Sequence, residues 1–289
     1  MIIQHNLGGM NAARNKGMSE TKMKKSLEKL SSGYRINRAG DDAAGLAISE
    51  LMRSQIRGLD QAMRNVNDGI SMTNTGEGAL SEVHAMLGRM KTLAVQSANA
   101  TYTTVARENL DFEREELIAE INRIGETSDF DDIPLFVSGD PEPYIPSGAP
   151  FQPPVRVDDI TLQIGHSAQE TLDVGRFVMS DLGLGLNADE VNIRTQDAAN
   201  AAIEKIEIAI EAVADIRAEF GAAYNHLEHT HNNLSVTSEN MTSAESRIRD
   251  TDMADEFTSF TRDNIVYQAA NSMVAQANAV PQQILSLLQ

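Results

Sequence analysis

The stretch MRSQIRGLDQAMRNVNDGISMTNTGEGALSEVHAML, residues 52–87, has an apolar residue at most third or fourth positions, which places these residues on one side of a helix. Eight of eleven positions in this heptad register are apolar. The register is Met52, Ile56, Leu59, Met63, Val66, Ile70, Thr73, Glu77, Leu80, His84 and Leu87. A spacing of about 3.5 residues is typical of a helix that packs one seam against partner helices. The stretch therefore predicts one long helix, from about residue 43 to 98.

Two later stretches carry seams of the same kind. The first predicts a helix over 105–127 and the second a helix over 195–250. Their seams are Leu110, Arg114, Leu117, Ile121 and Ile124, and then Ile203, Ile206, Ile210, Val213, Arg217, Phe220, Tyr224, Leu227, His231, Leu234, Ser238, Met241, Glu245 and Ile248. Three such helices bury their seams as an antiparallel bundle. The first would be roughly 85 Å long at 1.5 Å per residue, which favours an elongated rod.

A proline-rich segment interrupts the helical pattern. Residues 129–157 hold seven of the eight prolines, and proline at this density disfavours helix and central strand. We therefore expect an exposed loop there. Residues 160–164 alternate like a strand, and 172–179 offer a partner. The expected fold class is all-α dominated, with this loop and a small β-hairpin at about 129–180.

The two ends of the chain carry seams that nothing in their own segments covers. The C-terminal seam is unbroken over 266–287, and the N-terminal seams are shorter. The candidate self-assembly residues are Ile3, Leu7, Met10, Leu27, Leu30, Val266, Ala270, Met273, Ala277, Val280, Ile284 and Leu287. An uncovered apolar seam indicates a partner surface. We expect residues 1–41 and 252–289 to form a terminal coiled-coil domain and 42–251 to form the rod domain.

Composition excludes several function classes. The net charge of −18 disfavours nucleic acid, whose phosphates need a basic surface. No cysteine is present, so thiolate metal sites and cysteine nucleophiles are excluded. No apolar run is long enough to predict a membrane span, and the start lacks the pattern of a secretory signal peptide. Charge is uneven, with eight Lys and Arg in residues 1–40 and five acids in 250–289. This pattern is compatible with two solvated faces and with attraction of the two ends to each other or to their copies in neighbouring subunits.

Three groups of polar residues invite a chemical interpretation. His226, His229 and His231 have metal-ligand residue types, but His231 falls on the apolar seam and no HExxH motif is present. The acidic pair 41–42 precedes a predicted helix, where it would cap the N-terminus. The acidic pair 131–132 lies in the predicted loop. We expect no catalytic, cofactor or metal site, and hence no enzyme.

Four blocks of sequence resemble one known family. They are EKLSSGYRINRAGDDAAGLAISELMRSQIRGL (28–59), LAVQSANAT (93–101), SRIRDTDMADE (246–256) and VAQANAVPQQILSLL (274–288). All four are similar to segments of the bacterial flagellins, in the same order and at both ends. The resemblance covers about residues 1–135 and 190–289, and the short middle indicates a flagellin without the variable outer domains.

The resemblance implies a structural role in the flagellar filament, and no cofactor. Flagellins are exported unfolded by the flagellar type III apparatus and assemble into a helical tube for motility. Their terminal helices form an inner tube and the rod domain forms an outer one. The implied partners are further copies of the chain, the export chaperone, the filament cap and the hook-junction proteins. The start resembles spirochete periplasmic flagellins, whereas residues 77–90 are closer to those of Gram-positive anaerobes. We expect an extracellular filament, with a periplasmic one as the alternative.

The resemblance also implies a surface read by the flagellin-sensing Toll-like receptor of a host. By motif, the contacts would be Arg89, Leu93, Gln96 and Glu113. Gly88 stands where strongly activating members of the family carry a larger polar residue, and this chain departs from them there.

Three other functions deserve comparison. A hook–filament junction protein shares similar termini, and copy number in sheared filaments would distinguish it. A filament-displayed peptidase needs a larger insert with a zinc motif, which residues 136–190 do not contain. A cytoplasmic coiled-coil scaffold predicts ordered termini in the free chain, which hydrogen exchange would detect.

Overall fold

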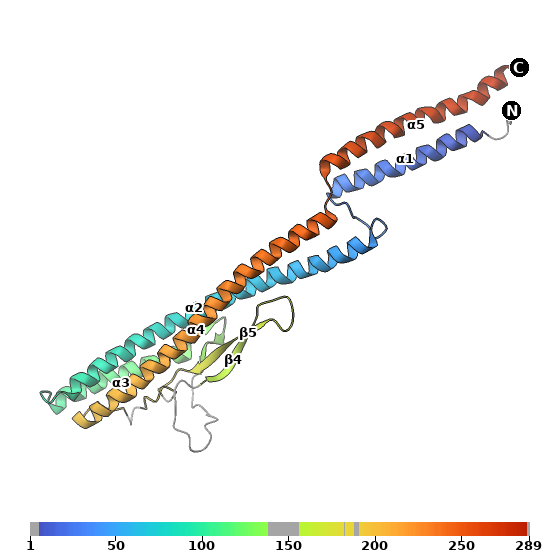
Figure 1. The fold of residues 1–289 in the computed structure, drawn as a ribbon. Helices are drawn as coiled ribbons and strands as arrows, with labels where there is room; N and C mark the ends of the chain where they lie inside the picture. Colours follow the sequence, from blue (N-terminus) through green and yellow to red (C-terminus); the bar gives the residue numbers. More distant parts are fainter. Residues whose placement is uncertain (1–5, 138–155, 182, 188–190, 288–289) are drawn as a thin grey trace. The chain divides into compact units, whose positions relative to one another are not determined.

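A computed structural model describes residues 6–137, 156–181, 183–187 and 191–287 (Figure 1). Its helices are α1 Leu7–Ser32, α2 Ala43–Ala98, α3 Thr104–Thr127, α4 Gln196–Arg249 and α5 Met253–Leu287. The strands are β1 Asp129–Phe130, β2 Ile133–Pro134, β3 Phe136–Val137, β4 Arg156–Gln163 and β5 Thr171–Val178. The expected all-α dominated fold with a small β-hairpin is confirmed. The bounds of α2, α3 and α4 agree with the predicted ones to within one residue.

The chain divides into two compact units. Unit 1 comprises residues 1–57 and 238–289, and unit 2 comprises residues 58–237. The sequence suggested boundaries at 41 and 252 instead. The difference arises because the start of α2 and the end of α4 are tied to the segments that lead to α1 and α5. These ties are backbone and side-chain hydrogen bonds, such as those of Arg35 with Arg249 and of Tyr34 with Arg53, and no local sequence pattern predicts them.

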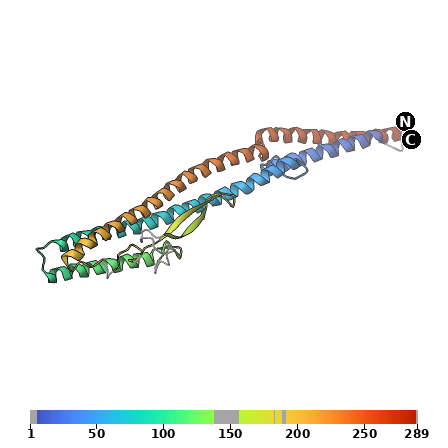
Figure 2. The same cartoon turned by 60° about the horizontal axis from the view of Figure 1, so that its bottom comes forward.

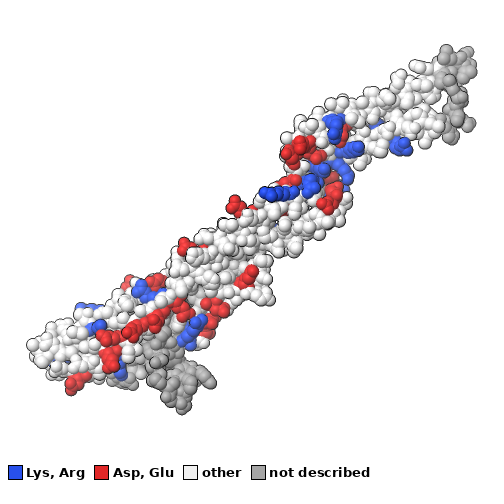
Figure 3. Space-filling model, in the orientation of Figure 1, with Lys and Arg blue, Asp and Glu red and all other residues white. Residues whose placement is uncertain are grey.

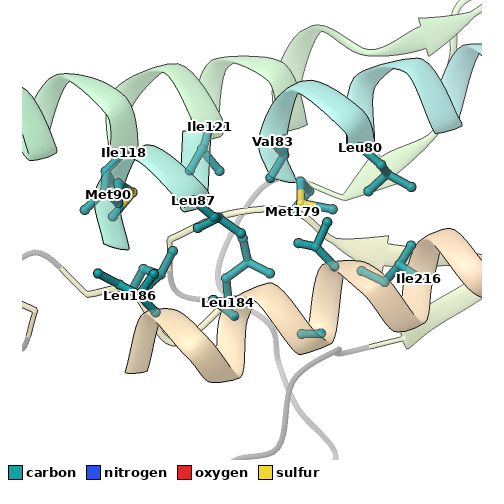
Figure 4. Close-up of a cluster of buried hydrophobic side chains, with 14 of the residues drawn as sticks. Leu80, Val83, Leu87, Met90, Ile118, Ile121, Met179, Leu184, Leu186 and Ile216 are labelled. Atoms are coloured by element: carbon teal, nitrogen blue, oxygen red, sulfur yellow. The ribbon is translucent and has the colours of Figure 1, made fainter. Parts of the chain in front are cut away.

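Unit 2 is built on α3 and on the parts of α2 and α4 that lie within it, packed side by side with α2 antiparallel to both α3 and α4 (Figures 1 and 2). Their buried side chains form one core, to which β3, β5, Leu184, Leu186, Val191 and Ile193 also contribute. Figure 4 shows Leu87 and Met90 of α2 packed among Ile118 and Ile121 of α3, with Leu184 and Leu186 close by. A core of this size explains why three seams with few aromatic residues fold together.

The buried seam of α2 has the predicted period, but every second buried position lies one residue before the predicted one. Its buried positions are Leu59, Ala62, Val66, Gly69, Thr73, Gly76, Leu80, Val83, Leu87, Met90, Ala94 and Ser97. Every second predicted position is shared, while Met63, Ile70 and His84 are only half-buried. The predicted register differs from the observed one because small residues occupy several of the buried positions between the shared positions. Apolar periodicity in a sequence is recognised mainly from large side chains. On α3 the shared positions are Arg114 and Ile121, but the other buried positions, Asp111, Ile118 and Gly125, lie one residue after the predicted ones.

Two of these small residues, Gly69 and Gly76, lie where side chains of neighbouring elements pack closely against α2. A Cβ on Gly76 would lie 2.4 Å from Cε1 of Phe220, a ring that is 2% exposed. A Cβ on Gly69 would lie 2.8 Å from Cδ1 of Leu162 on β4. Both helical glycines therefore allow α2 to come close to its neighbours, which offsets their poor helix propensity.

We expect Gly76→Ala to destabilise unit 2. The added methyl group cannot enter the packed core without moving Phe220, and such overpacking costs about 1–3 kcal/mol, less the roughly 1 kcal/mol gained in helix propensity. Gly78→Ala is the matched control, because a Cβ at Gly78 has nothing within 4 Å. Urea unfolding should rank the stabilities Gly78→Ala, then wild type, then Gly76→Ala. A Gly76→Ala protein as stable as Gly78→Ala would contradict the packing described here.

The β-region forms a small sheet in unit 2. β4 and β5 pair antiparallel, β3 pairs parallel with β5, and the order is β3-β5-β4. β1 and β2 form a separate pair around Asp131 and Asp132, whose φ angles of 53° and 61° suit a tight hairpin turn.

The expectation of an exposed loop from residue 129 is wrong for its first part. Leu135 and Phe136 are each 1% exposed, and the Phe136 ring lies 6.3 Å from the ring of Phe220. The burial of the short apolar run Leu135–Phe136 could not be predicted, because the prolines that follow it indicate an exposed loop. The rest of the predicted loop, residues 138–155, lies outside the described residues.

In unit 1, α1 and α5 pack along each other in opposite directions. Asn6 donates from Nδ2 to the carbonyl oxygen of Ala277 at 2.8 Å. Lys16 Nζ lies 5.9 Å from the centre of the Tyr267 ring, and Lys29 pairs with Glu256 at 3.5 Å. The basic end and the acidic end of the chain therefore meet, as their charges suggested. Each terminal helix therefore covers one face of the other, although nothing within its own segment covers its seam.

Candidate assembly surface

The outer faces of α1 and α5 remain strongly apolar. Ten large apolar side chains are exposed on the described parts of these two helices. They are Leu7, Met10, Met18 and Leu27 on α1, and Met253, Phe257, Ile265, Val266, Met273 and Val280 on α5. A pair of helices has no third layer to cover such side chains. An exposed apolar surface of this extent on paired helices indicates a contact with another chain.

Charge is almost absent from the far end of the same pair. Residues 1–13 and 264–289 contain no Lys, Arg, Asp or Glu. Figure 3 shows the consequence, because blue and red atoms on the visible face gather near the end of α1 and thin out toward the two termini. A surface without charge can be buried against copies of itself without desolvating ions.

The predicted assembly residues divide between two faces. Leu7, Met10 and Leu27 are exposed on α1, and Leu30 is half-buried. On α5 the exposed residues are Val266, Met273 and Val280, whereas Ala270 and Ala277 are half-buried. The half-buried positions on α5 recur at heptad spacing, at residues 256, 260, 263, 267, 270, 274 and 277. Ile3 lies outside the described residues, as do the side chains of Ile284 and Leu287.

The terminal helices are joined to the rest of unit 1 by two short segments that bond to each other. The backbone N–H of Arg35 donates to the carbonyl oxygen of Arg249 at 2.7 Å, and that of Thr251 donates to Gly33 at 3.0 Å. Tyr34 and Asp250 form the bridge between these bonds. Gly33, with φ of 77°, ends α1 in the left-handed region that favours glycine.

The Tyr34 ring fixes this junction. The guanidinium carbons of Arg249 and Arg53 lie 5.0 and 5.7 Å from the ring centre. Arg249 also pairs with Glu50, and its hydrogen bond is the main cause that lowers the pKa of that carboxyl group. Arg53 pairs with Glu245 at 3.4 Å. Sequence reasoning missed this cluster, although its members lie in or beside two of the quoted flagellin-like blocks.

An ion cluster around the buried Asp111 holds the segment that precedes α4 against α3. Arg114 and Asp111 have side chains that are each 1% exposed, and Arg114 Nε donates to Asp111 Oδ1 at 2.7 Å. Arg194 Nε donates to Asp111 Oδ2 at 2.6 Å, and the backbone N–H of Ile193 donates to Asp111 Oδ1 at 3.3 Å. Burial raises the pKa of Asp111, but the bonds from Arg114 and Arg194 outweigh it and hold that pKa below its ordinary value. Arg114 was visible in the sequence only as an exception in an apolar seam.

The four predicted receptor contacts do not share one surface. Arg89 and Glu113 pair at 2.7 Å, and both are partly exposed. Gln96 donates to the hydroxyl of Tyr102 at 2.7 Å. Leu93 is 0% exposed and belongs to the core, so its side chain is not available to a receptor. This sequence block therefore contributes both to the core and to the surface.

The remaining candidates lie apart from any cluster of ligands. His226 and His229 are exposed and His231 is half-buried. Within the described ranges, no group of three or more His, Cys, Asp or Glu residues could hold a metal ion. Asp42 Oδ1 accepts from the N–H of Gly45 at 2.9 Å, which is the expected capping bond at the start of α2. None of the described helices is both long and apolar enough to cross a membrane.

The fold and the exposed terminal faces define a helical structural protein that associates with further copies of itself. Comparison with known proteins identifies the family. The model of the bacterial flagellin N-terminal helical region matches residues 3–139, and that of the C-terminal helical region matches residues 203–288. The chain belongs to the bacterial flagellin family and is a structural subunit of the flagellar filament.

Individual relatives match the whole chain. A flagellin of Halalkalibacterium halodurans is 48% identical, with all of both chains covered. The flagellar filament 33 kDa core protein of Treponema phagedenis is 40% identical, again over the full length of both. Among solved structures, the flagellin of Bacillus cereus is 27% identical with a TM-score of 0.49, covering 63% of this chain and 94% of that one.

Proposed function

We propose that copies of this chain polymerise through the α1–α5 pair, which forms the inner tube of the filament, while unit 2 forms the outer tube. The observation that carries the proposal is the exposure of ten large apolar side chains on the described parts of α1 and α5. Burial of apolar surface is worth roughly 25 cal/mol per Å², so these side chains supply a strong driving force for association.

The contacts within the pair support this arrangement. Asn6, Lys16 and Lys29 are already engaged with Ala277, Tyr267 and Glu256. One face of each helix is thereby occupied by its partner in the same chain, and the outer faces are left to meet neighbouring copies. The uncharged stretch at each end of the chain makes those outer faces self-complementary.

Unit 2 suits an outer layer because it has its own core and charged cross-links. Arg217 donates twice to Glu77, at 2.7 and 3.2 Å, and so joins α4 to α2. Exposed apolar side chains on this unit include Val95 of α2 and Val105 and Phe112 of α3. These three are candidates for lateral contacts between neighbouring copies.

The other implied roles follow from membership of the filament. We propose export in an unfolded form, an extracellular filament rather than a periplasmic one, and interactions with an export chaperone, the filament cap and the hook-junction proteins. A host receptor would contact Arg89, Gln96 and Glu113. The chain is a structural protein, and we propose that it has no catalytic activity. Immunogold labelling of intact cells tests the location, because only an external filament is accessible to antibody.

A single substitution tests the assembly face. We expect Met273→Glu to raise the critical concentration for polymerisation by about tenfold or more, because a carboxylate would be buried without a partner. Met273 is 64% exposed in the single chain, so the substitution should leave the folding of the monomer unchanged.

The matched control is Met273→Leu, which keeps the volume and apolar character of the side chain. We expect its critical concentration, measured by sedimentation, to stay near that of the wild type. Polymerisation of Met273→Glu at the wild-type concentration would rule out α5 as an inner-tube contact at this position.

A further inference from the structure

The methionines of the chain are distributed unevenly between surface and core. Within the described residues, four methionine side chains are exposed: Met10 65%, Met18 52%, Met253 50% and Met273 64%. All four lie on α1 or α5. The other described methionines are buried or half-buried.

The chain has few other side chains that a hydroperoxide would oxidise before the exposed methionines. The chain contains no cysteine and no tryptophan. Thioethers are therefore the side chains most readily oxidised by a hydroperoxide, and exposure decides which of them react first. Met10 and Met273 also belong to the stretches without charge. Because Asn6 bonds to Ala277 and Lys16 lies over Tyr267, Met10 is level with Met273 along the pair.

We propose that Met10, Met18, Met253 and Met273 form a peroxide-sensitive modification site that controls assembly. Oxidation of the free subunit blocks polymerisation, and polymerisation shields the same four residues. This inference rests on the proposed function, in which the outer faces of α1 and α5 are buried between copies.

The chemistry is a two-electron oxygen transfer. The lone pair of the methionine sulfur attacks the terminal oxygen of a hydroperoxide, the S–O bond forms and the O–O bond breaks. The leaving oxygen takes the proton, so hydrogen peroxide yields water and the sulfur becomes a sulfoxide. The product replaces an apolar thioether by a strong hydrogen-bond acceptor. Burying such an oxygen without a donor weakens association by about tenfold or more.

The test compares the full-length protein before and after treatment with hydrogen peroxide. Peptide mass spectrometry gives the oxidation of each methionine, and sedimentation gives the critical concentration. We expect the four exposed methionines to oxidise first in the monomer and the critical concentration to rise about tenfold or more. In preassembled filaments these residues should oxidise several-fold more slowly. Treatment with methionine sulfoxide reductases should restore assembly.

Two variants assign the effect to these residues. In the first, Met10, Met18, Met253 and Met273 are all replaced by leucine, and assembly should survive peroxide. In the second, the half-buried Met63, Met86 and Met241 are replaced by leucine, and assembly should remain peroxide-sensitive.

The inference is overturned if monomers carrying the four sulfoxides polymerise at the wild-type concentration, or if the fourfold leucine variant is as sensitive as the wild type. Failure of the proposed function gives a different result. In that case the untreated protein would tolerate Met273→Glu without any change in critical concentration.

Discussion

Removal of residues 266–289 should abolish filament formation while leaving a folded, soluble protein. The deletion takes away Val266, Met273 and Val280 and most of the uncharged part of α5. The core of unit 2 lies wholly within residues 58–237, so it should fold without them. We expect no polymer at concentrations at which the full-length chain polymerises completely.

The measurement is electron microscopy and sedimentation of the truncated and full-length proteins under the same conditions. Far-UV circular dichroism and urea unfolding provide the control, because the truncated protein should retain the cooperative transition of unit 2. Normal filaments from the truncated chain would show that α5 is dispensable and would contradict the account.

The second large effect is expected at the buried ion cluster. Asp111→Asn should destabilise unit 2 by about 3 kcal/mol, since it removes the buried counter-ion of the buried Arg114. Glu115→Gln is the matched control. Glu115 also faces Arg114 and Arg194, at 3.5 and 3.3 Å, but its side chain is 45% exposed, so we expect its loss to cost less than about 1 kcal/mol.

The pH dependence of unit 2 follows from the same cluster. The pKa of Asp111 is lower in the folded protein than its ordinary value of 3.8. The unfolded chain therefore binds the proton more readily, and the stabilisation by Asp111 is complete above that ordinary value and lost as the pH falls below it. We expect the difference in unfolding free energy between wild type and Asp111→Asn to shrink below about pH 4. An equal difference at pH 7 and pH 3 would contradict this assignment.

The helices of unit 2 could be predicted from the sequence because their signal is local. Heptad spacing and the capping residue Asp42 are properties of neighbouring positions, and they gave α2 its full length. The register was harder, because the choice between Ile70 and Gly69 as the buried residue depends on Leu162 and Leu227, far away in the chain.

The assembly surface was only half predictable for a related reason. An apolar seam on α5 was evident, but its alanines turned out to face α1 while its larger residues remain exposed. The distinction depends on Lys16, Lys29 and Asn6 meeting α5, and periodicity within one helix carries no such information. The Tyr34 junction and the Asp111 cluster join residues more than 80 positions apart, so a sequence pattern could not reveal either.

The central claim is that the α1–α5 pair lines the inside of the filament. Cryo-electron microscopy of filaments reassembled from the purified full-length chain tests it most directly. The account predicts an inner tube of paired helices in which Met10, Met273 and Val280 contact neighbouring subunits, surrounded by an outer layer formed by unit 2. A filament in which these side chains face solvent, or in which α1 and α5 lie on the outer surface, would contradict it.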